Sequence, residues 1–358
     1  MAGEKVWKLA LAGFGSVGRG LVELLHENRG RLEERCGFRA QVCLIVSRSH
    51  GTALMPDGLS LGEVLQTFVE AGRLGTACKA EDNRAPFEEL LARSGAEVLI
   101  EATPTNLDGG EPGLSHVRCA LERGLHVVTS NKAPIALAYD ELNRLARERG
   151  VRLLFEGTVQ GGTPLLAMAR EGLAGCAIEG VQGILNASTN YVLTEMEKGR
   201  TYEEACAEAR SAGVLEADPT LDVEGWDAAV KLVILAHVLF DANMRVEDVD
   251  REGITRVTPE MIRDAKERGE RIKLLAELKR EGSALRASVR PMSLPLSNPI
   301  AALDGTENIV TLYADPLGPV TLRGSGGGGR ETAQGILADL LSIARYARDG
   351  ERHSTGNK

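Results

Sequence analysis

Two periodicities alternate along the first half of the chain, one typical of strands and one typical of helices. Short apolar runs predict five strands, at 6–12, 41–46, 97–102, 126–130 and 151–155. Between several of them, segments such as GRGLVELLHEN and HVRCALERG carry apolar residues at helical spacing. Strands that alternate with helices predict an α/β fold, a Rossmann-type doubly wound parallel sheet with helices on both faces.

Beyond residue 150 the pattern changes. A strand-like VQGILN at 181–186 precedes expected helices at 201–212, 224–240 and 258–281 and expected strands at 284–291 and 308–322. This half predicts an α+β domain. A last helical segment, TAQGILADLLSIARYARDG, has an apolar face that needs a partner.

These patterns predict three parts. We expect a first domain over 1–150, a second domain over 151–330, and a C-terminal helix over 331–350 that packs back on the first domain. A chain of 358 residues is long enough for two cores.

Composition narrows the class of protein. The net charge of −9 argues against a nucleic-acid partner, and no apolar run is long enough to span a bilayer. The N-terminus has no secretory pattern, and the six cysteines show neither CxxC nor Cys/His ligand spacing. Reduced thiols, Cys78 among them, and a cytoplasmic location are therefore expected.

A glycine turn follows the first expected strand. It comprises Gly13, Phe14, Gly15, Ser16, Val17 and Gly18. Because it leads from a strand into a helix, GFGSVG has the context of a dinucleotide-binding turn, in which glycines admit a pyrophosphate and the helix N-terminus receives its charge. The alternative is a glycine-rich turn without a ligand.

The end of the second expected strand bears on the choice of dinucleotide. An enzyme that prefers NAD would have an acidic residue there to hold the ribose 2′-hydroxyl, but this chain has SRSH. Arg48 could bind a 2′-phosphate, which favours NADP. An arginine exposed in a loop is the alternative, and NAD remains possible.

Acidic residues collect at the start of an apolar helix, in EADPTLDVEGWDAAVK at 216–231. On a helix Asp227 and Lys231 are one turn apart and share a face, so the carboxylate can keep the ammonium charged. The alternatives are an i,i+4 surface pair and, for Asp222, a helix N-cap. Asp218, before a proline, is expected in a turn.

Several stretches together closely resemble homoserine dehydrogenase. They are GFGSVG, TSNKAPIA (129–136), FEGTVQGGTPLL (155–166), GILNASTNYVLTEME (183–197) and ARSAGVLEADPTLDVEGWDAAVK (209–231). The resemblance extends to about residue 345. It implies a reaction in which L-aspartate 4-semialdehyde and L-homoserine are interconverted by hydride transfer with NAD(P)H, on the route to threonine, methionine and isoleucine.

The resemblance implies roles for individual residues. Lys231 corresponds to the family's proton donor, and Glu216 and Asp227 to its homoserine-binding acids, which receive the substrate ammonium. Asp222 would either cap the helix or contact the ligand, and Tyr191 would line the substrate pocket. Lys132, in SNKAP, would be the electrostatic partner and the alternative proton carrier, because the sequence does not decide which lysine transfers the proton.

Cofactor and cation residues follow from the same resemblance. Besides the glycine turn, Arg48 and Lys132, the expected cofactor contacts are Thr103, Gly213, Gly326, Gly327 and Gly328. The expected ligands of a structural sodium ion are Glu156, Val159, Gly161 and Thr163, a set of oxygen donors that suits a hard cation.

The resemblance also implies a homodimer formed through the second domain. No ACT regulatory module follows the final helix, so feedback through one should be absent. Two alternatives are open. Aspartate-semialdehyde dehydrogenase would need a cysteine nucleophile in an activating setting, and a non-catalytic NAD(P) sensor would need the glycine turn but no substrate-binding acids.

Overall fold

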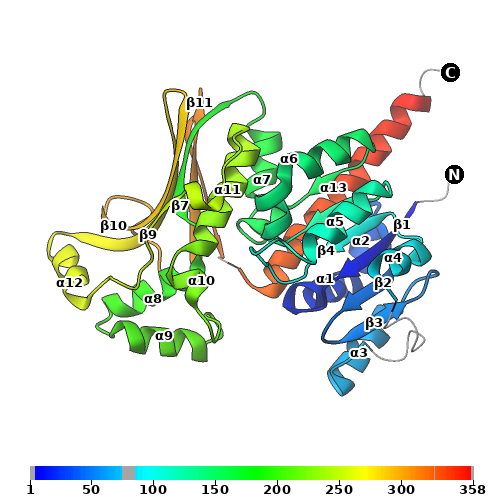
Figure 1. The fold of residues 1–358 in the computed structure, drawn as a ribbon, viewed down its shortest axis with the longest axis horizontal. Coiled ribbons are helices and arrows are strands. Elements are labelled where there is room, and N and C mark those ends of the chain that lie inside the picture. Colours follow the sequence, from blue (N-terminus) through cyan, green and yellow to red (C-terminus); the bar gives the residue numbers. More distant parts are fainter. Residues whose placement is uncertain (1–4, 75–84, 326, 356–358) are drawn as a thin grey trace. The chain divides into compact units, whose positions relative to one another are not determined.

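The computed structural model describes residues 5–74, 85–325 and 327–355 (Figure 1). Cys78 and Gly326, which carry expectations from the sequence, lie outside the described residues. The chain divides into two compact units: unit 1 contains residues 1–162 and 328–358, and unit 2 contains residues 163–327. The chain therefore returns to unit 1 for its last helix.

Unit 1 is built on a six-stranded sheet with the order β3-β2-β1-β4-β5-β6. Its strands are β1 (Val6–Ala12), β2 (Arg39–Ser47), β3 (Gly51–Leu54), β4 (Val98–Glu101), β5 (His126–Thr129) and β6 (Leu153–Leu154). All neighbours pair in parallel except β2 and β3. The predicted doubly wound sheet is confirmed, and the antiparallel edge strand β3 is an addition that the sequence pattern did not predict.

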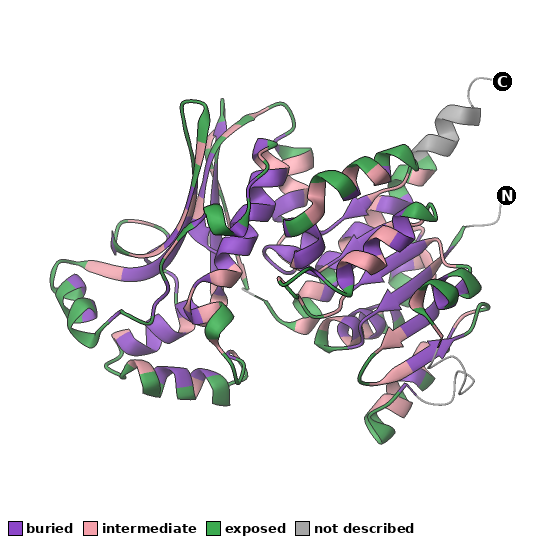
Figure 2. Ribbon diagram, viewed as in Figure 1, coloured by how far each residue is buried: buried purple, intermediate pink, exposed green. Residues whose placement is uncertain are grey.

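Helices lie on both faces of this sheet. They are α1 (Ser16–Glu27), α2 (Arg29–Cys36), α3 (Leu61–Ala71), α4 (Phe87–Ser94), α5 (Gly113–Glu122), α6 (Lys132–Glu148) and α13 (Gly329–Thr355). The helices α1 and α13 pack against each other and share one apolar core with β1, β2 and β4, whereas α4, α5 and α6 form a separate layer. Figure 2 shows the central strands as buried.

Unit 2 contains a second six-stranded sheet, with the order β12-β11-β7-β9-β10-β8. Its strands are β7 (Ala177–Ile184), β8 (Asp250–Arg251), β9 (Glu270–Glu281), β10 (Ala284–Pro295), β11 (Glu307–Asp315) and β12 (Gly318–Ser325). Its helices are α7 (Leu165–Ala167), α8 (Ala187–Glu197), α9 (Tyr202–Ser211), α10 (Thr220–Val223), α11 (Trp226–Phe240) and α12 (Pro259–Glu267). The helices α8, α11 and α12 pack against β9, which gives the α+β character that the sequence predicted.

Two predicted elements of unit 2 are wrong. The segment 308–322 was expected to be one strand, but it spans parts of β11 and β12, which pair antiparallel. The segment 258–281 was expected to be a single helix, but α12 ends at Glu267 and β9 begins at Glu270. Gly269 has a φ of +71°, a left-handed conformation that ends the helix. Beyond it the chain is buried without interruption from Ile272 to Ala276, which is the pattern of a central strand covered on both faces.

Within the part of the chain that the structure describes, every helix is too short or too polar to cross a membrane.

Candidate functional site

The glycine turn leaves open space at the start of α1. Gly13 has a φ of +100°, and a Cβ there would lie 2.3 Å from the Ala102 oxygen, while a Cβ on Gly18 would lie 2.3 Å from the Gly13 oxygen. A Cβ on Gly15 would meet no atom within 4 Å. Gly15 is also the N-cap of α1 and supplies no side chain to its amides. These uncapped amides with free space before them fit a pyrophosphate.

The position of the turn in the sheet supports the same ligand. Gly13 follows β1 and Ala102 follows β4, and these two parallel strands are neighbours in the middle of the sheet. After β1 the chain continues to β2 and β3 on one side, and after β4 it continues to β5 and β6 on the other. A doubly wound sheet binds ligands at such a point, beyond the carboxyl ends of the strands. Gly329 also approaches this turn, because a Cβ there would lie 2.6 Å from the main chain of Ser16.

The other residues of the turn have unequal exposure. Ser16 is exposed and Val17 is half-buried, whereas the Phe14 side chain is buried and packs edge-on against Phe68. Phe14 can therefore contact a dinucleotide only through its main chain. Arg48 is exposed in the turn between β2 and β3, where its guanidinium is accessible to a ligand.

A buried polar cluster lies where β4 and β5 end. The Thr103 hydroxyl donates to the Glu101 carboxylate and accepts from the Asn131 amide at 3.2 Å. Asn131 is the N-cap of α6, accepting from the Ala133 amide at 3.1 Å, so it fixes the position of Lys132, the first residue of that helix. Neither Glu101 nor Asn131 was among the predicted site residues, although Glu101 lies in the predicted strand 97–102 and Asn131 lies in the quoted stretch TSNKAPIA.

In unit 2 the predicted lysine Lys231 and two of the predicted acids, Asp222 and Asp227, converge on one network. Lys231 is 8% exposed, and its ammonium donates to Asp227 Oδ2 at 2.7 Å and to the Leu185 carbonyl at 2.6 Å. The carboxylate offsets the cost of burying the ammonium in the apolar helix α11. An ammonium has three donors, so one remains for a further oxygen. The surface-pair alternative for Asp227 and Lys231 is therefore wrong.

The network also answers the question of Asp222. The N-cap of α10 is Pro219 and that of α11 is Gly225, so Asp222 caps neither helix. Its carboxylate instead accepts from the side-chain amide of Asn186 at 2.6 Å, and the same nitrogen donates to Asp227 at 2.9 Å. Asn186 was not among the predicted site residues, although it lies within the quoted stretch GILNASTNY.

Three other predicted residues, all in the segment between α9 and α10, have simpler surroundings. Glu216 is exposed in the segment between α9 and α10, and Gly213 follows α9 with a φ of +70°. Asp218 accepts from the amide and hydroxyl of Thr220, which hold the pKa of its carboxyl below the ordinary value. Asp218 is thus a turn residue, as predicted.

The predicted cation ligands lie on either side of the boundary between the units. Glu156 is buried, Val159 is buried, and Gly161 has a φ of +58°, all in unit 1, whereas Thr163 begins unit 2. The Glu156 amide donates to Asp339 of α13 at 2.8 Å. The described residues contain no group of three or more His, Cys, Asp or Glu side chains that could hold a metal. The buried Glu156 carboxylate is an oxygen donor of the kind that hard cations prefer.

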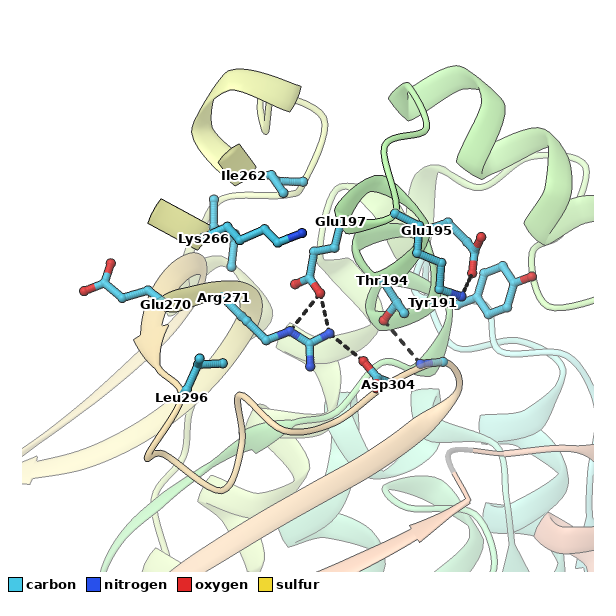
Figure 3. A pocket seen from close by; sticks show the side chains of 13 residues that line it. Tyr191, Thr194, Glu195, Glu197, Ile262, Lys266, Glu270, Arg271, Leu296 and Asp304 are labelled. Carbon is cyan, nitrogen blue, oxygen red and sulfur yellow. Dashed lines mark hydrogen bonds and ion pairs between the residues drawn. The ribbon is translucent and has the colours of Figure 1, made fainter. Parts of the chain in front are cut away.

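Unit 2 has a cavity of about 570 Å³ apart from the Lys231 network. Tyr191 lies on its wall (Figure 3), and Arg271 crosses it between Glu197 and Asp304, with its Nε 2.7 Å from Glu197 Oε2. Neither Lys231 nor the acids bonded to its network line this cavity. Tyr191 therefore lines a cavity that is separate from the Lys231 network, and the arginine of this cavity, Arg271, is already paired with two acids.

Comparisons with known proteins agree with this geometry. The family model for the homoserine dehydrogenase NAD binding domain matches residues 13–156, and the model for homoserine dehydrogenase matches residues 164–341. An NAD(+)-dependent homoserine dehydrogenase of Pseudomonas canavaninivorans is 38% identical, over 97% of this chain and 99% of that protein. A homoserine dehydrogenase of Methanocaldococcus jannaschii is 36% identical, over 94% and 98%.

A solved structure matches equally well. It is a hyperthermophilic archaeal homoserine dehydrogenase in complex with NADPH, 33% identical, with a TM-score of 0.82, over 96% of this chain and 98% of that one.

Proposed function

The chain belongs to the homoserine dehydrogenase family, and from that premise we propose which of its residues perform the reaction. The activity is the NAD(P)-dependent interconversion of L-aspartate 4-semialdehyde and L-homoserine. When bound, the nicotinamide supplies the hydride for reduction and takes it up in the reverse direction. The rest of the chemistry requires a proton at the reacting oxygen and a counter-charge for the substrate ammonium.

Lys231 is the proton donor to that oxygen in our proposal. The observation that carries it is the ammonium held between Asp227 and the Leu185 carbonyl, with a third donor left over. Asp227 orients this lysine, and the network also holds Asp222 close by through Asn186. A positioned acid of this kind typically contributes about 10²–10⁴-fold to a rate.

Glu216 receives the substrate ammonium together with these acids. Its exposure leaves the carboxylate open to a ligand. Asp222, which is bonded to the network through Asn186, is assigned to the surroundings of the substrate. The same assignment for Tyr191 rests on the resemblance alone, because the cavity that Tyr191 lines is separate from the Lys231 network. Lys132, fixed at the start of α6 by the Asn131 cap, is the electrostatic partner and the alternative proton carrier.

The dinucleotide is held by unit 1. We assign its pyrophosphate to the turn from Gly13 to Gly18 and further contacts to Thr103, Lys132, Gly213 and the loop around Gly327 and Gly328.

NADP is the preferred form in this proposal, because Arg48 is exposed at the end of β2, where no acid occupies the 2′-hydroxyl position. The relatives include one named for NAD(+) and one solved with NADPH, so preference is a property of the individual chain. Steady-state kinetics of Arg48→Ala test the assignment: NADPH should lose at least about tenfold in kcat/KM while NADH changes little. Equal losses with both cofactors would remove Arg48 from the site.

A structural sodium ion at Glu156, Val159, Gly161 and Thr163 is a further part of the proposal. It is supported by the buried Glu156 carboxylate and by the all-oxygen donor set. Thermal unfolding in sodium and in choline chloride at equal ionic strength tests it, with a higher midpoint expected in sodium. Equal midpoints would contradict it.

We also propose a cytoplasmic homodimer. The five described cysteines are free thiols, which suits a reducing compartment. The dimer rests on resemblance, and light scattering of the purified chain would measure its mass directly.

One assay tests the activity itself. Absorbance of NADPH is followed with aspartate semialdehyde, and NADPH formation is followed with homoserine, for the wild-type chain and for Lys231→Ala. Turnover in either direction that disappears in the variant is expected. Turnover no faster than in the variant would refute the assignment.

A further inference from the structure

The side chain of Asn186 uses its whole hydrogen-bonding capacity. Its oxygen accepts from the Thr189 amide at 2.8 Å and the Thr189 hydroxyl at 2.9 Å, as the N-cap of α8. Its nitrogen donates to Asp222 Oδ1 at 2.6 Å and to Asp227 Oδ2 at 2.9 Å. The side chain is buried, with 4% of the residue exposed. All four of its bonds are made within the protein.

These bonds fix which way the amide points. The main-chain amide of Thr189 can only donate, so the oxygen of Asn186 must face α8 and its NH₂ group must face the two carboxylates. The helix cap therefore aims two donors at the acids. No other residue type combines a cap oxygen with a double donor in this shape, since aspartate lacks the donors and serine lacks the reach.

The two acids need those donors because they repel each other. One oxygen of each carboxylate, Asp222 Oδ1 and Asp227 Oδ2, lies within 2.9 Å of the side-chain nitrogen of Asn186. The ammonium of Lys231 bonds to Asp227. The first turn of α8 carries the side chains of Ser188 and Thr189, which are neutral and add no charge beside the acids. The ammonium of Lys273 in β9 bonds to Asn190, farther along that helix. Like-charged neighbours favour retention of a proton, and donated hydrogen bonds oppose this.

We propose that Asn186 is a positioning residue of the reaction: its amide holds Asp222 and Asp227 together as two carboxylates and thereby aims Asp227 at Lys231. The inference rests on the proposed function, because it assumes that Lys231 and Asp227 act on the substrate. Asn186 acts through these residues and does not itself contact the reacting atoms.

Two substitutions separate the donors from the cap. Asn186→Ser keeps a good N-cap residue and loses both donors, and Asn186→Asp keeps the shape and replaces the donors by a third acid. Thr258→Ala is the control, because Thr258 caps α12 and is remote from the acids in sequence, so it reports what loss of a helix cap does by itself.

The pH profile of kcat/KM is the decisive measurement, since it reports the free enzyme. We expect the acid limb of Asn186→Ser to move up by about one pH unit and that of Asn186→Asp to move further, with kcat reduced about tenfold or more at neutral pH. Thr258→Ala should lower the unfolding midpoint and leave the limb in place.

Each other outcome has a definite meaning. If the acid limbs of both Asn186 variants superpose on that of the wild type, the inference is overturned. This holds also if their activity falls, as long as it falls only in proportion to their stability, as in the control. A wild-type chain without turnover would refute the proposed function instead. The inference would then be decided by urea unfolding at several pH values: the stability deficit of both Asn186 variants should shrink as the pH falls and the two acids become protonated, whereas the deficit of Thr258→Ala should stay constant.

Discussion

Replacing Lys231 by methionine removes the ammonium and keeps most of the side chain's volume. Two acceptors then lose a donor, Asp227 Oδ2 at 2.7 Å and the buried Leu185 carbonyl at 2.6 Å. An unsatisfied buried acceptor costs about 1–3 kcal/mol, and Asp227 retains its bond from Asn186. We therefore expect the free energy of unfolding to fall by about 2–4 kcal/mol.

The activity should fall further than the stability. Loss of a positioned acid lowers kcat by about 10²–10⁴, which corresponds to about 3–5 kcal/mol at the transition state. The dissociation constant of NADPH, measured by its fluorescence, should not change, because the glycine turn belongs to unit 1. Lys266→Met is the matched control, since Lys266 is exposed on α12, and it should retain wild-type kcat.

The assay is stopped-flow or steady-state reduction of aspartate semialdehyde at a temperature where circular dichroism shows both variants folded. A folded Lys231→Met enzyme with kcat within about threefold of the wild type would refute the assignment of Lys231 as the proton donor. Parallel losses of activity and NADPH binding would point to unfolding instead.

Four further substitutions test other parts of the structure. Gly18→Ala places a Cβ 2.3 Å from a main-chain oxygen and should destabilise the turn, whereas Gly15→Ala meets no protein atom and should fold normally while NADPH binding by fluorescence titration weakens at least about tenfold. Burial lowers the pKa of Lys273 to about 8 from the 10.5 of an exposed lysine. Between these two pH values the unfolded chain therefore carries a proton on Lys273 that the folded chain lacks, and stability rises with pH. Urea titrations measure the free energy of unfolding at about pH 7.5 and about pH 10. Between these pH values that of the wild type should rise by up to about 3 kcal/mol relative to that of Lys273→Met. The same difference between the two proteins at both pH values would contradict this. Glu216→Gln should raise the KM for homoserine about tenfold with little change in kcat, and Glu203→Gln on the exposed face of α9 should do neither.

Local patterns predicted the parts of the fold that depend on local forces. The β1 strand, the glycine turn and α1 follow from an apolar run, a strict steric requirement and a helical period, all between Val6 and Glu27. The segment 270–281 shows the limit. Its Leu, Lys, Glu and Ala residues favour a helix by propensity, but pairing with β7 and β10 on both sides makes it a strand.

The candidate site was predictable to a similar degree. Asp227 and Lys231 are four residues apart, so their contact follows from helix geometry. Asn186 is 41 residues from Asp227 and reaches it only because α8 begins beside α11. An asparagine before a helical run already predicts a cap, but nothing local indicates what the other end of its amide would bind.

The long helix α13 has a consequence for how the molecule is made. It belongs to unit 1, where it packs on α1 and its Asp339 accepts from the Glu156 amide, yet its residues are the last of the described chain to leave the ribosome. Unit 2 is synthesised completely before the first unit has all its parts. A truncated chain that ends near residue 327 should therefore contain every residue of unit 2 but lack α13, so we expect the nucleotide-binding unit to bind dinucleotide only after α13 has been added.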